Sequence, residues 1–153
     1  MIIYFDTEFT NIFGPARLIS AGFVAEDGQE FYFELTDNYK NNDCSYFVLE
    51  NVLPYLNVSE HGMSSAQAVL KLKAWCESFS EPVQFASDAP AYDFGLLSSL
   101  LREQKVSIEN ADTECLRVDE VEDKIENYFE YEPLAIRHHA LWDARALASA
   151  FRT

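Results

Sequence analysis

The sequence predicts an α/β fold, a single domain over residues 1–153 with a mixed sheet. Short apolar runs of strand length alternate with segments whose apolar residues recur at helical spacing. Their order is strand, hairpin, helix, strand, helix, strand and helix, which is typical of α/β domains. The composition agrees, because 48% of the residues are hydrophobic and 14% are aromatic, enough to build a full core.

Five strands are expected, the last of them only weakly supported. They are residues 2–5, 18–25, 30–35, 83–86 and 113–118. The second and third are joined by Asp27-Gly28, a dipeptide that favours a tight hairpin turn. Antiparallel pairing of these two strands, followed by strands separated by helices, predicts the mixed character of the sheet.

Four helical segments are expected between and after the strands. They are residues 47–53, 64–79, 92–101 and 140–151. Pro54 stops the first segment. Ser64 and Gln67 form a capping-box pattern at the start of the second. The last is rich in small residues, so it can pack closely on the sheet.

The net charge of −15 argues against nonspecific binding of nucleic acid through a basic surface. Much of the imbalance is local, since residues 103–132 hold eleven acidic and three basic side chains. The simplest interpretation is a solvated face that keeps the protein in solution. The alternative is an interaction surface for a basic partner, which makes a noncatalytic acidic interaction module one hypothesis for the protein.

The cellular location is predicted from the N-terminal segment, from the lengths of the apolar stretches and from the cysteines. The N-terminal apolar run lacks a preceding basic region and is interrupted by Asp6, which is unlike a signal peptide. No apolar stretch approaches the ~20 residues that span a bilayer. The three cysteines are odd in number and lack CxxC spacing, which is typical of thiols in a reducing compartment. A cytoplasmic protein without membrane contact is expected.

Asp6-Thr7-Glu8 follows the first predicted strand. Side chains two residues apart on a strand point to the same face, so both carboxylates can converge on one point. Carboxylates held this close repel each other unless a cation lies between them. A metal site is therefore one interpretation, and a solvated turn is the other.

Two further carboxylates stand in helical segments. Asp93 lies at the start of a predicted helix, where the helix dipole alone would favour it. Asp143 lies in a helix otherwise suited to burial, where an unpaired carboxylate is costly. Either an ion pair with Arg137 or Arg145, or a metal, would explain it.

His138 and His139 precede Asp143 by five and four residues. Five residues correspond to a rotation of ~140° on a helix, so His138 fits better on the loop that leads into it. From there its ring can lean over a site that Asp143 helps to form.

Three segments together resemble, in order and spacing, the motifs of the DEDDh 3′–5′ exonucleases: FDTEF at 5–9, AYDFGLL at 91–97 and HHALWDARAL at 138–147. Residues 2–10, 18–32 and 51–54 are also similar to small stand-alone exoribonucleases of the mycobacterial ribonuclease AS type. This closer likeness covers about the first third of the chain and the two later motifs. Residues 100–132 carry no resemblance.

The resemblance implies an RNase H-like (DnaQ-like) fold with a mixed five-stranded sheet, and hydrolysis that uses two Mg²⁺ or Mn²⁺ ions. Asp6 would bridge the ions, Glu8 and Asp143 would hold the first, and Asp93 would help to hold the second. His138 would be the general base, because the family places its histidine five residues before the last aspartate. The doubled histidine leaves open which ring acts.

Four residues near these motifs are expected to contact substrate: Thr7, Phe9, Tyr92 and Arg137. For Phe9 the alternatives are core packing and a platform for the terminal base, since base–aromatic stacking is tolerant of sequence. For Tyr92 the preferred interpretation is a core residue, and contact with substrate is the alternative. Arg137 could contact phosphate, with Arg145 nearby.

The resemblance implies a substrate that is single-stranded RNA or a 3′ overhang, shortened from its 3′ end to nucleoside 5′-monophosphates. The same chemistry on DNA is the main alternative, because the contact that would separate them, to the 2′-hydroxyl, cannot be located from the sequence. A homodimer is left open.

Overall fold

The computed structural model describes residues 1–151 and shows one mixed sheet of six strands in the order β4-β3-β2-β1-β5-β6. The strands are β1 (Ile2–Phe9), β2 (Leu18–Ala25), β3 (Glu30–Leu35), β4 (Gly62–Met63), β5 (Gln84–Ser87) and β6 (Leu116–Arg117). β1, β2 and β3 pair in antiparallel fashion, whereas β4 pairs in parallel with β3, β5 with β1 and β6 with β5.

The α/β class and the mixed sheet are confirmed, and the expected number of five strands is wrong. The additional strand, β4, has two residues and includes a glycine, so it is too short for an alternating apolar pattern to reveal it. β1 also continues past the expected residue 5 to Phe9, because Asp6 and Glu8 remain paired with β2. This extension carries both carboxylates on the strand itself.

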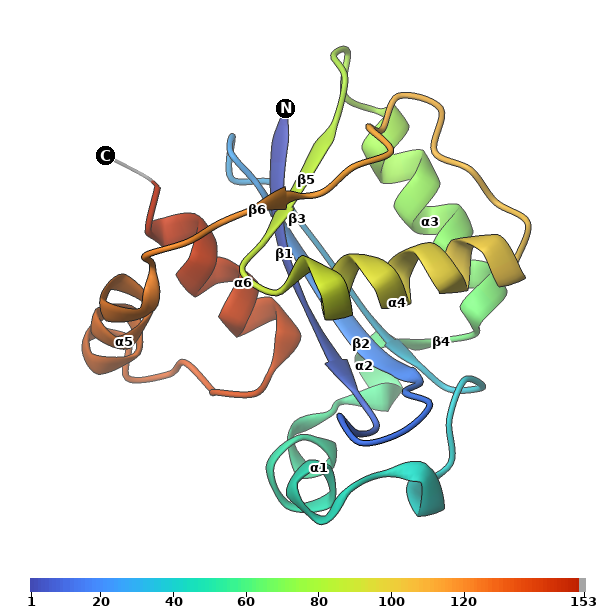
Figure 1. Cartoon of the computed structure of the whole chain (residues 1–153), viewed down its shortest axis with the longest axis vertical. Coiled ribbons are helices and arrows are strands. Elements are labelled where there is room, and N and C mark those ends of the chain that lie inside the picture. The colour runs from blue at the N-terminus through green and yellow to red at the C-terminus, as the bar shows by residue number, and fades with distance from the viewer. Residues whose placement is uncertain (152–153) are drawn as a thin grey trace.

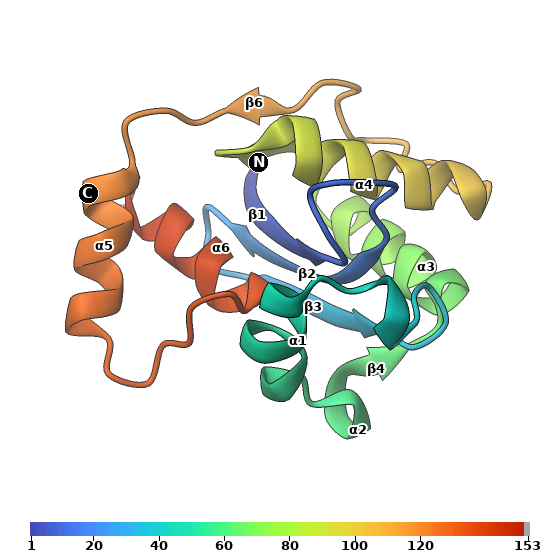
Figure 2. The ribbon, with the colours of Figure 1, turned by 60° about the horizontal axis from the view of Figure 1, so that its bottom comes forward.

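Two layers of helices cover the sheet (Figures 1 and 2). The helices are α1 (Tyr46–Asn51), α2 (Val58–His61), α3 (Ser65–Glu77), α4 (Pro90–Glu103), α5 (Glu122–Tyr131) and α6 (Ala140–Ser149), with 3₁₀ turns at Asn41–Asp43 and Leu53–Tyr55. Figure 1 shows α3 and α4 on one side of the sheet and α5 and α6 on the other. α1 and α2 lie together at the end of the sheet where β1 finishes.

The larger core cluster lies between the sheet and the α3–α4 layer. It is built around aromatic rings from four strand positions, Phe5, Phe23, Phe33 and Phe85, each at most 2% exposed. Rings of Phe5 and Phe23 stack at 5.5 Å. Burial of side chains this large provides the main stabilisation of the sheet.

The opposite face of the sheet is lined by smaller side chains and receives α6. Ala144, Leu147 and Ala148 of α6 pack there against Tyr4 and Val24. Small helical residues allow the helix to approach the strands closely, as the sequence indicated. α5, which no sequence pattern predicted, packs on the outside of α6.

Local signals explain where several helices begin. Ser64 and Gln67 form the expected capping box at the start of α3, with both hydrogen bonds at 3.2 Å. Pro90 occupies the first turn of α4, where its missing N–H costs nothing. Within residues 1–151, no helix combines the length and the apolarity that crossing a membrane requires.

Candidate active site

The face of the sheet that meets α6 carries Asp6 and Glu8, because both alternate to that side of β1. Gly22 of β2 pairs with Asp6 and lies beneath the first turn of α6. A Cβ at this position would lie only 2.4 Å from the backbone of Leu141, so the helix rests directly on the glycine. This close approach brings Asp143 of α6 within reach of the β1 carboxylates.

The carboxylates line a cleft of about 280 Å³ between β1, α5 and α6. Its lining residues are Asp6, Thr7, Glu8, Asp88, Ile125, Arg137, His138, Asp143 and Leu147. Residues from both ends of the chain therefore meet in one cleft.

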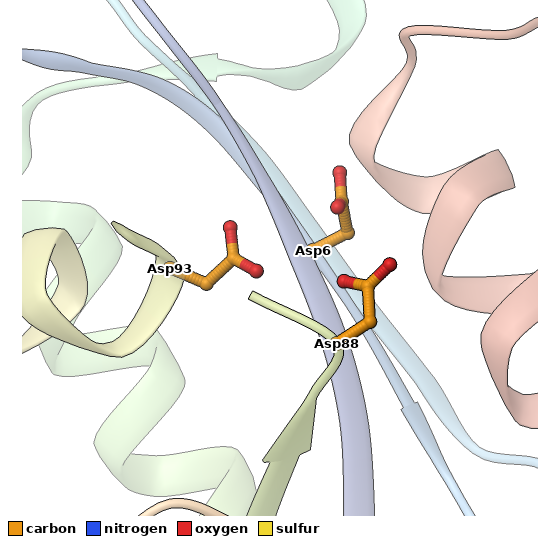
Figure 3. A group of neighbouring side chains, drawn as sticks. All are labelled: Asp6, Asp88 and Asp93. Carbon is orange, nitrogen blue, oxygen red and sulfur yellow. The ribbon is translucent and has the colours of Figure 1, made fainter. Parts of the chain in front are cut away.

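Within the described residues, two groups of three carboxylates each place one oxygen per residue within 4.8 Å of the others. The first group is Asp6, Glu8 and Asp143, and the second is Asp6, Asp88 and Asp93. Figure 3 shows the second group, which gathers from β1, from the segment after β5 and from α4. Asp6 belongs to both groups and is therefore central to the site.

Asp93 is the most buried carboxylate of the site, at 2% exposure. The Thr7 hydroxyl donates to one of its oxygens at 2.6 Å, and the Ser87 hydroxyl donates to the other. These donors lower the pKa of Asp93, but burial outweighs them and raises it to about 6. Thr7 thus contacts a carboxylate of the site and holds its orientation.

The remaining carboxylates also have raised pKa values. Burial, followed by repulsion from Asp143 and Asp93, raises the pKa of Glu8 to about 8. Burial raises the pKa of Asp143 to about 7. The pKa of Asp6 is raised well above its usual range by burial and by the charges of Asp93 and Asp143.

This electrostatic pattern fits divalent cations. Several carboxylates held together at a cost in free energy gain most from a bound positive charge, and oxygen ligands are those that Mg²⁺ and Mn²⁺ prefer. The two carboxylate groups that share Asp6 are therefore candidate ligand sets for divalent cations.

Neither arginine near Asp143 forms an ion pair with it. Arg145 makes a bidentate pair with Glu30, with both distances at 2.8 Å. Arg137 pairs with Glu126 at 2.5 Å and lies over the ring of Phe129 at 4.4 Å. The ion-pair explanation of Asp143 is therefore wrong. The charge of Arg137 only partly offsets the rise that burial causes in the pKa of Asp143.

The two histidines have different surroundings. His138 lies on the loop before α6, lines the cleft and has a positive φ of 58°. Its ring packs perpendicular to that of Phe47, with ring centroids 4.9 Å apart. Burial lowers the pKa of His138, and so does Arg137, which favours the neutral ring that can accept a proton. His139 instead directs its ring against Tyr32 at 4.9 Å.

Phe9 and Tyr92 lie next to the cleft and stack on each other, with ring centroids 5.5 Å apart. Tyr92 is 49% exposed, so its interpretation as a core residue is wrong. A second, apolar cavity of about 540 Å³ continues from Glu8 and Phe9 toward α1. Its other walls include Phe13 and Phe47. An aromatic surface thus adjoins the carboxylates.

Asp88 is the carboxylate of this cleft that no sequence motif indicated. It follows β5, whose carboxyl end lies beside the middle of β1 because the two strands are parallel neighbours. An acidic residue directly after a strand becomes a signal only once the strand is known to run parallel to its neighbour, since ligands bind at the carboxyl ends of such strands.

No family model matches the sequence, and no curated protein sequence matches it significantly. The structure is similar to the nuclease domain of 3'hExo, a DEDDh family member that was crystallised bound to rAMP. The TM-score is 0.64 at 12% sequence identity, and the match covers 97% of this chain and 88% of that domain. The fold of this chain is therefore similar to that of this nuclease domain.

Proposed function

We propose that the protein is a metal-dependent 3′–5′ exonuclease that removes nucleoside 5′-monophosphates from the 3′ end of single-stranded RNA. The observation that carries the proposal is the pair of carboxylate groups that share Asp6, of which all members but Asp93 line one cleft together with His138. The three sequence motifs of the DEDDh type contribute this histidine and all of these carboxylates except Asp88.

In this proposal Asp6 would contribute to the binding of both ions, Mg²⁺ or Mn²⁺. Glu8 and Asp143 would complete one set of ligands, and Asp88 and Asp93 would complete the other. Bound in such a site, divalent ions neutralise the phosphate and stabilise the charge that develops on the entering and leaving oxygens. They also explain how an acidic protein accepts an anionic substrate.

The neutral ring of His138 accepts the proton of the attacking water. A positioned base of this kind contributes roughly 10²–10⁴-fold to a rate. His138 lines the cleft, and the contact of its ring with Phe47 limits the motion of the ring.

We assign substrate contacts to the aromatic residues next to the cleft. Phe9 and Tyr92 offer a stacked pair of rings to the terminal base, since stacking on an aromatic ring gives about 1–3 kcal/mol with little base preference. Thr7 acts indirectly by orienting Asp93. Arg137 stands at the rim, where its pairing with Glu126 leaves the guanidinium only partly available for a phosphate.

Two features support RNA as the substrate class. The first third of the sequence is similar to stand-alone exoribonucleases of the ribonuclease AS type, and the structural neighbour was crystallised with a ribonucleotide, rAMP. Both features concern other proteins, so the sugar preference is the part of the proposal that needs its own test.

The test uses the purified protein with Mg²⁺ or Mn²⁺ and matched ribo- and deoxy-oligonucleotides whose 3′ or 5′ ends are blocked separately. We expect the RNA to be shortened from a free 3′ end to 5′-monophosphates, with no activity in excess EDTA and none for Asp6→Asn. Faster cleavage of the DNA strand would reassign the substrate to DNA. Internal cuts in a 3′-blocked strand, or activity in chelator, would refute the exonuclease mechanism.

A further inference from the structure

Beyond the cleft, the same face of the sheet continues into a buried polar cluster on β2 and β3. Glu8 pairs with Ser20, and Ser20 pairs with Glu34, so these three side chains form one row across three strands. Asp6, Gly22 and Tyr32 form the next row. Side chains in both rows point toward α6.

Glu34 is the centre of this cluster and is completely buried. One of its oxygens accepts hydrogen bonds from the Tyr32 hydroxyl at 2.6 Å and from the Asn57 backbone N–H at 3.0 Å. A buried carboxylate requires a reason, because burial of a charged group is among the costliest features a fold can contain. No step of the proposed reaction uses Glu34.

The cluster reaches the active site through Tyr32 and His139. The Tyr32 ring lies between the rings of His61 and His139, at 5.1 Å and 4.9 Å. His139 is the residue before α6, and its backbone N–H donates to the Asp143 carboxylate at 3.1 Å. One residue thus connects the buried cluster to a carboxylate of the cleft and to the adjacent His138.

Three buried polar atoms in this region have no partner among the described residues: the Ser20 hydroxyl, the second oxygen of Glu34 and Nδ1 of His139. All three belong to the same face of the sheet or to the residue that covers it. Buried polar atoms of this kind are rare in native proteins and mark places where a fold retains polar groups for a specific arrangement.

We propose that Tyr32, Glu34 and His139 form a positioning cluster that fixes the segment 137–139, so that the His138 ring and the Asp143 carboxylate face the cleft together. Glu34 holds the Tyr32 hydroxyl, the Tyr32 ring supports the His139 ring, and the His139 backbone holds Asp143. The proposal rests on the proposed function, because the placement of His138 affects a rate only if the cleft is an active site.

The strain at His138 explains why such support is needed. A histidine with φ of 58° occupies a sparsely populated backbone region and stays there only if its surroundings impose it. On one side, Phe47 contacts the ring of His138 itself. On the other side, the anchored ring of His139 prevents the backbone from relaxing.

The experiment compares four variants in the full-length protein. Tyr32→Phe removes the hydroxyl but keeps the ring, and Glu34→Leu removes the acceptor. Glu34→Gln keeps an oxygen that can accept both hydrogen bonds and serves as the conservative rescue. Tyr4→Phe removes a hydroxyl from the same face of the sheet, outside the cluster, and is the matched control.

We expect Tyr32→Phe and Glu34→Leu to lower kcat on the oligonucleotide by about ten-fold with little change in KM, because a small misplacement of a base is costly to rate. Glu34→Gln and Tyr4→Phe should stay within about three-fold of the wild type. In a His138→Ala background, Tyr32→Phe should cost only about two- to three-fold, because the loss through His138 has already occurred and only the effect on Asp143 remains.

A second readout does not depend on activity. Exchange of the His139 amide hydrogen with solvent should become at least about ten-fold faster in Tyr32→Phe, while amides in α3 keep their protection. Unchanged exchange at His139, or additive losses with His138→Ala, would overturn the positioning cluster. A wild-type protein that cuts no nucleic acid would instead refute the proposed function, and exchange at His139 would still decide the structural claim.

Discussion

At the scale of single residues, the carboxyl groups of the cleft determine both catalysis and stability. Asp143→Asn keeps an oxygen that can accept from the His139 N–H but removes one negative charge. We expect turnover to fall by roughly 10³-fold or more, because a metal ligand is lost. The metal-free variant should be more stable than the metal-free wild type, as is common when an active-site charge is removed.

The control for this variant is Asp112→Asn, which removes a charge from an exposed carboxylate outside the cleft. It should leave turnover unchanged. Thermal unfolding in EDTA measures the stability of the metal-free proteins, and an oligonucleotide assay in Mg²⁺ measures turnover. An Asp143→Asn protein that retains full turnover would remove Asp143 from the set of metal ligands.

The raised pKa values also predict how the metal-free protein responds to pH. Glu8, Asp93 and Asp143 titrate near 8, 6 and 7 in the folded protein, above their ordinary values of 4.5, 3.8 and 3.8. The folded state therefore binds protons that the unfolded chain has released, so stability begins to fall above the ordinary pKa values of 3.8 to 4.5, and the loss continues as the pH rises from about 6 to 8.

Melting temperatures in EDTA across this interval test the prediction. The fall should be smaller for Asp143→Asn and smaller again for the wild type in excess Mg²⁺, because either a lost charge or a bound cation relieves the repulsion. A melting temperature that rises over this interval would show that the carboxylates are not destabilising in the folded protein.

At the same scale, His138 and His139 are expected to have different roles. His138→Ala should reduce turnover by roughly 10²–10⁴-fold, the usual contribution of a positioned base. His139→Ala should cost less, about ten-fold, because it acts only through placement. Calorimetry with Mn²⁺ should give both variants the metal affinity of the wild type, which would confirm that neither ring is a ligand. A larger loss for His139→Ala would assign the base to the other ring.

At the scale of elements, the seating of α6 on β2 assembles the site. A Cβ at Gly22 would meet backbone atoms of Ala140 and Leu141 at 2.5 and 2.4 Å, and backbone cannot move aside as a side chain can. We expect Gly22→Ala to destabilise the protein by about 1–3 kcal/mol or more and to reduce turnover by moving Asp143 away from Asp6.

Gly95 provides the matched control in α4. A Cβ there would have nothing within 4 Å, and the residue is exposed on a helix. Gly95→Ala should therefore stabilise the protein by about 0.5–1 kcal/mol without changing turnover. Denaturant unfolding of both variants measures the contrast. A Gly22→Ala protein as stable and active as wild type would mean that α6 does not need this close contact.

The elements also show what a sequence can reveal. β2 and β3 were predicted at their observed bounds, because their apolar runs are long and Asp27-Gly28 separates them. α5 was not predicted, since its sequence is dominated by charges and its partner is another helix rather than the core. Asp88 was overlooked because its role depends on the parallel pairing of β5 with β1, which no local pattern reveals.

At the scale of the whole molecule, bound cations should stabilise the fold. A ligand that binds only the folded state at about 100 times its Kd adds about 2.7 kcal/mol, which for a domain of this size corresponds to roughly 5–10 °C in melting temperature. We expect this rise with Mg²⁺ or Mn²⁺ and its loss in Asp6→Asn, whose side chain belongs to both carboxylate groups. Thermal unfolding of both proteins with and without EDTA measures this rise in melting temperature. An equal rise in Asp6→Asn would place the cation elsewhere.

The overall charge of −15 predicts how the protein holds its substrate. Few cations are available to follow a long phosphate backbone, and Arg137 and Arg145 are already paired with Glu126 and Glu30. Binding should therefore depend on the metals and on the terminal nucleotides. With about 2–3 phosphates neutralised, log K should fall by only ~0.7 per phosphate for each ten-fold rise in salt.

The His138→Ala protein suits the measurement of this salt dependence, because it should bind RNA while cutting it slowly. Fluorescence anisotropy across a salt series gives the slope, and Glu126→Gln should steepen it by at most about one phosphate by releasing Arg137. A slope of six or more phosphates would mean that the RNA follows a basic path outside the cleft.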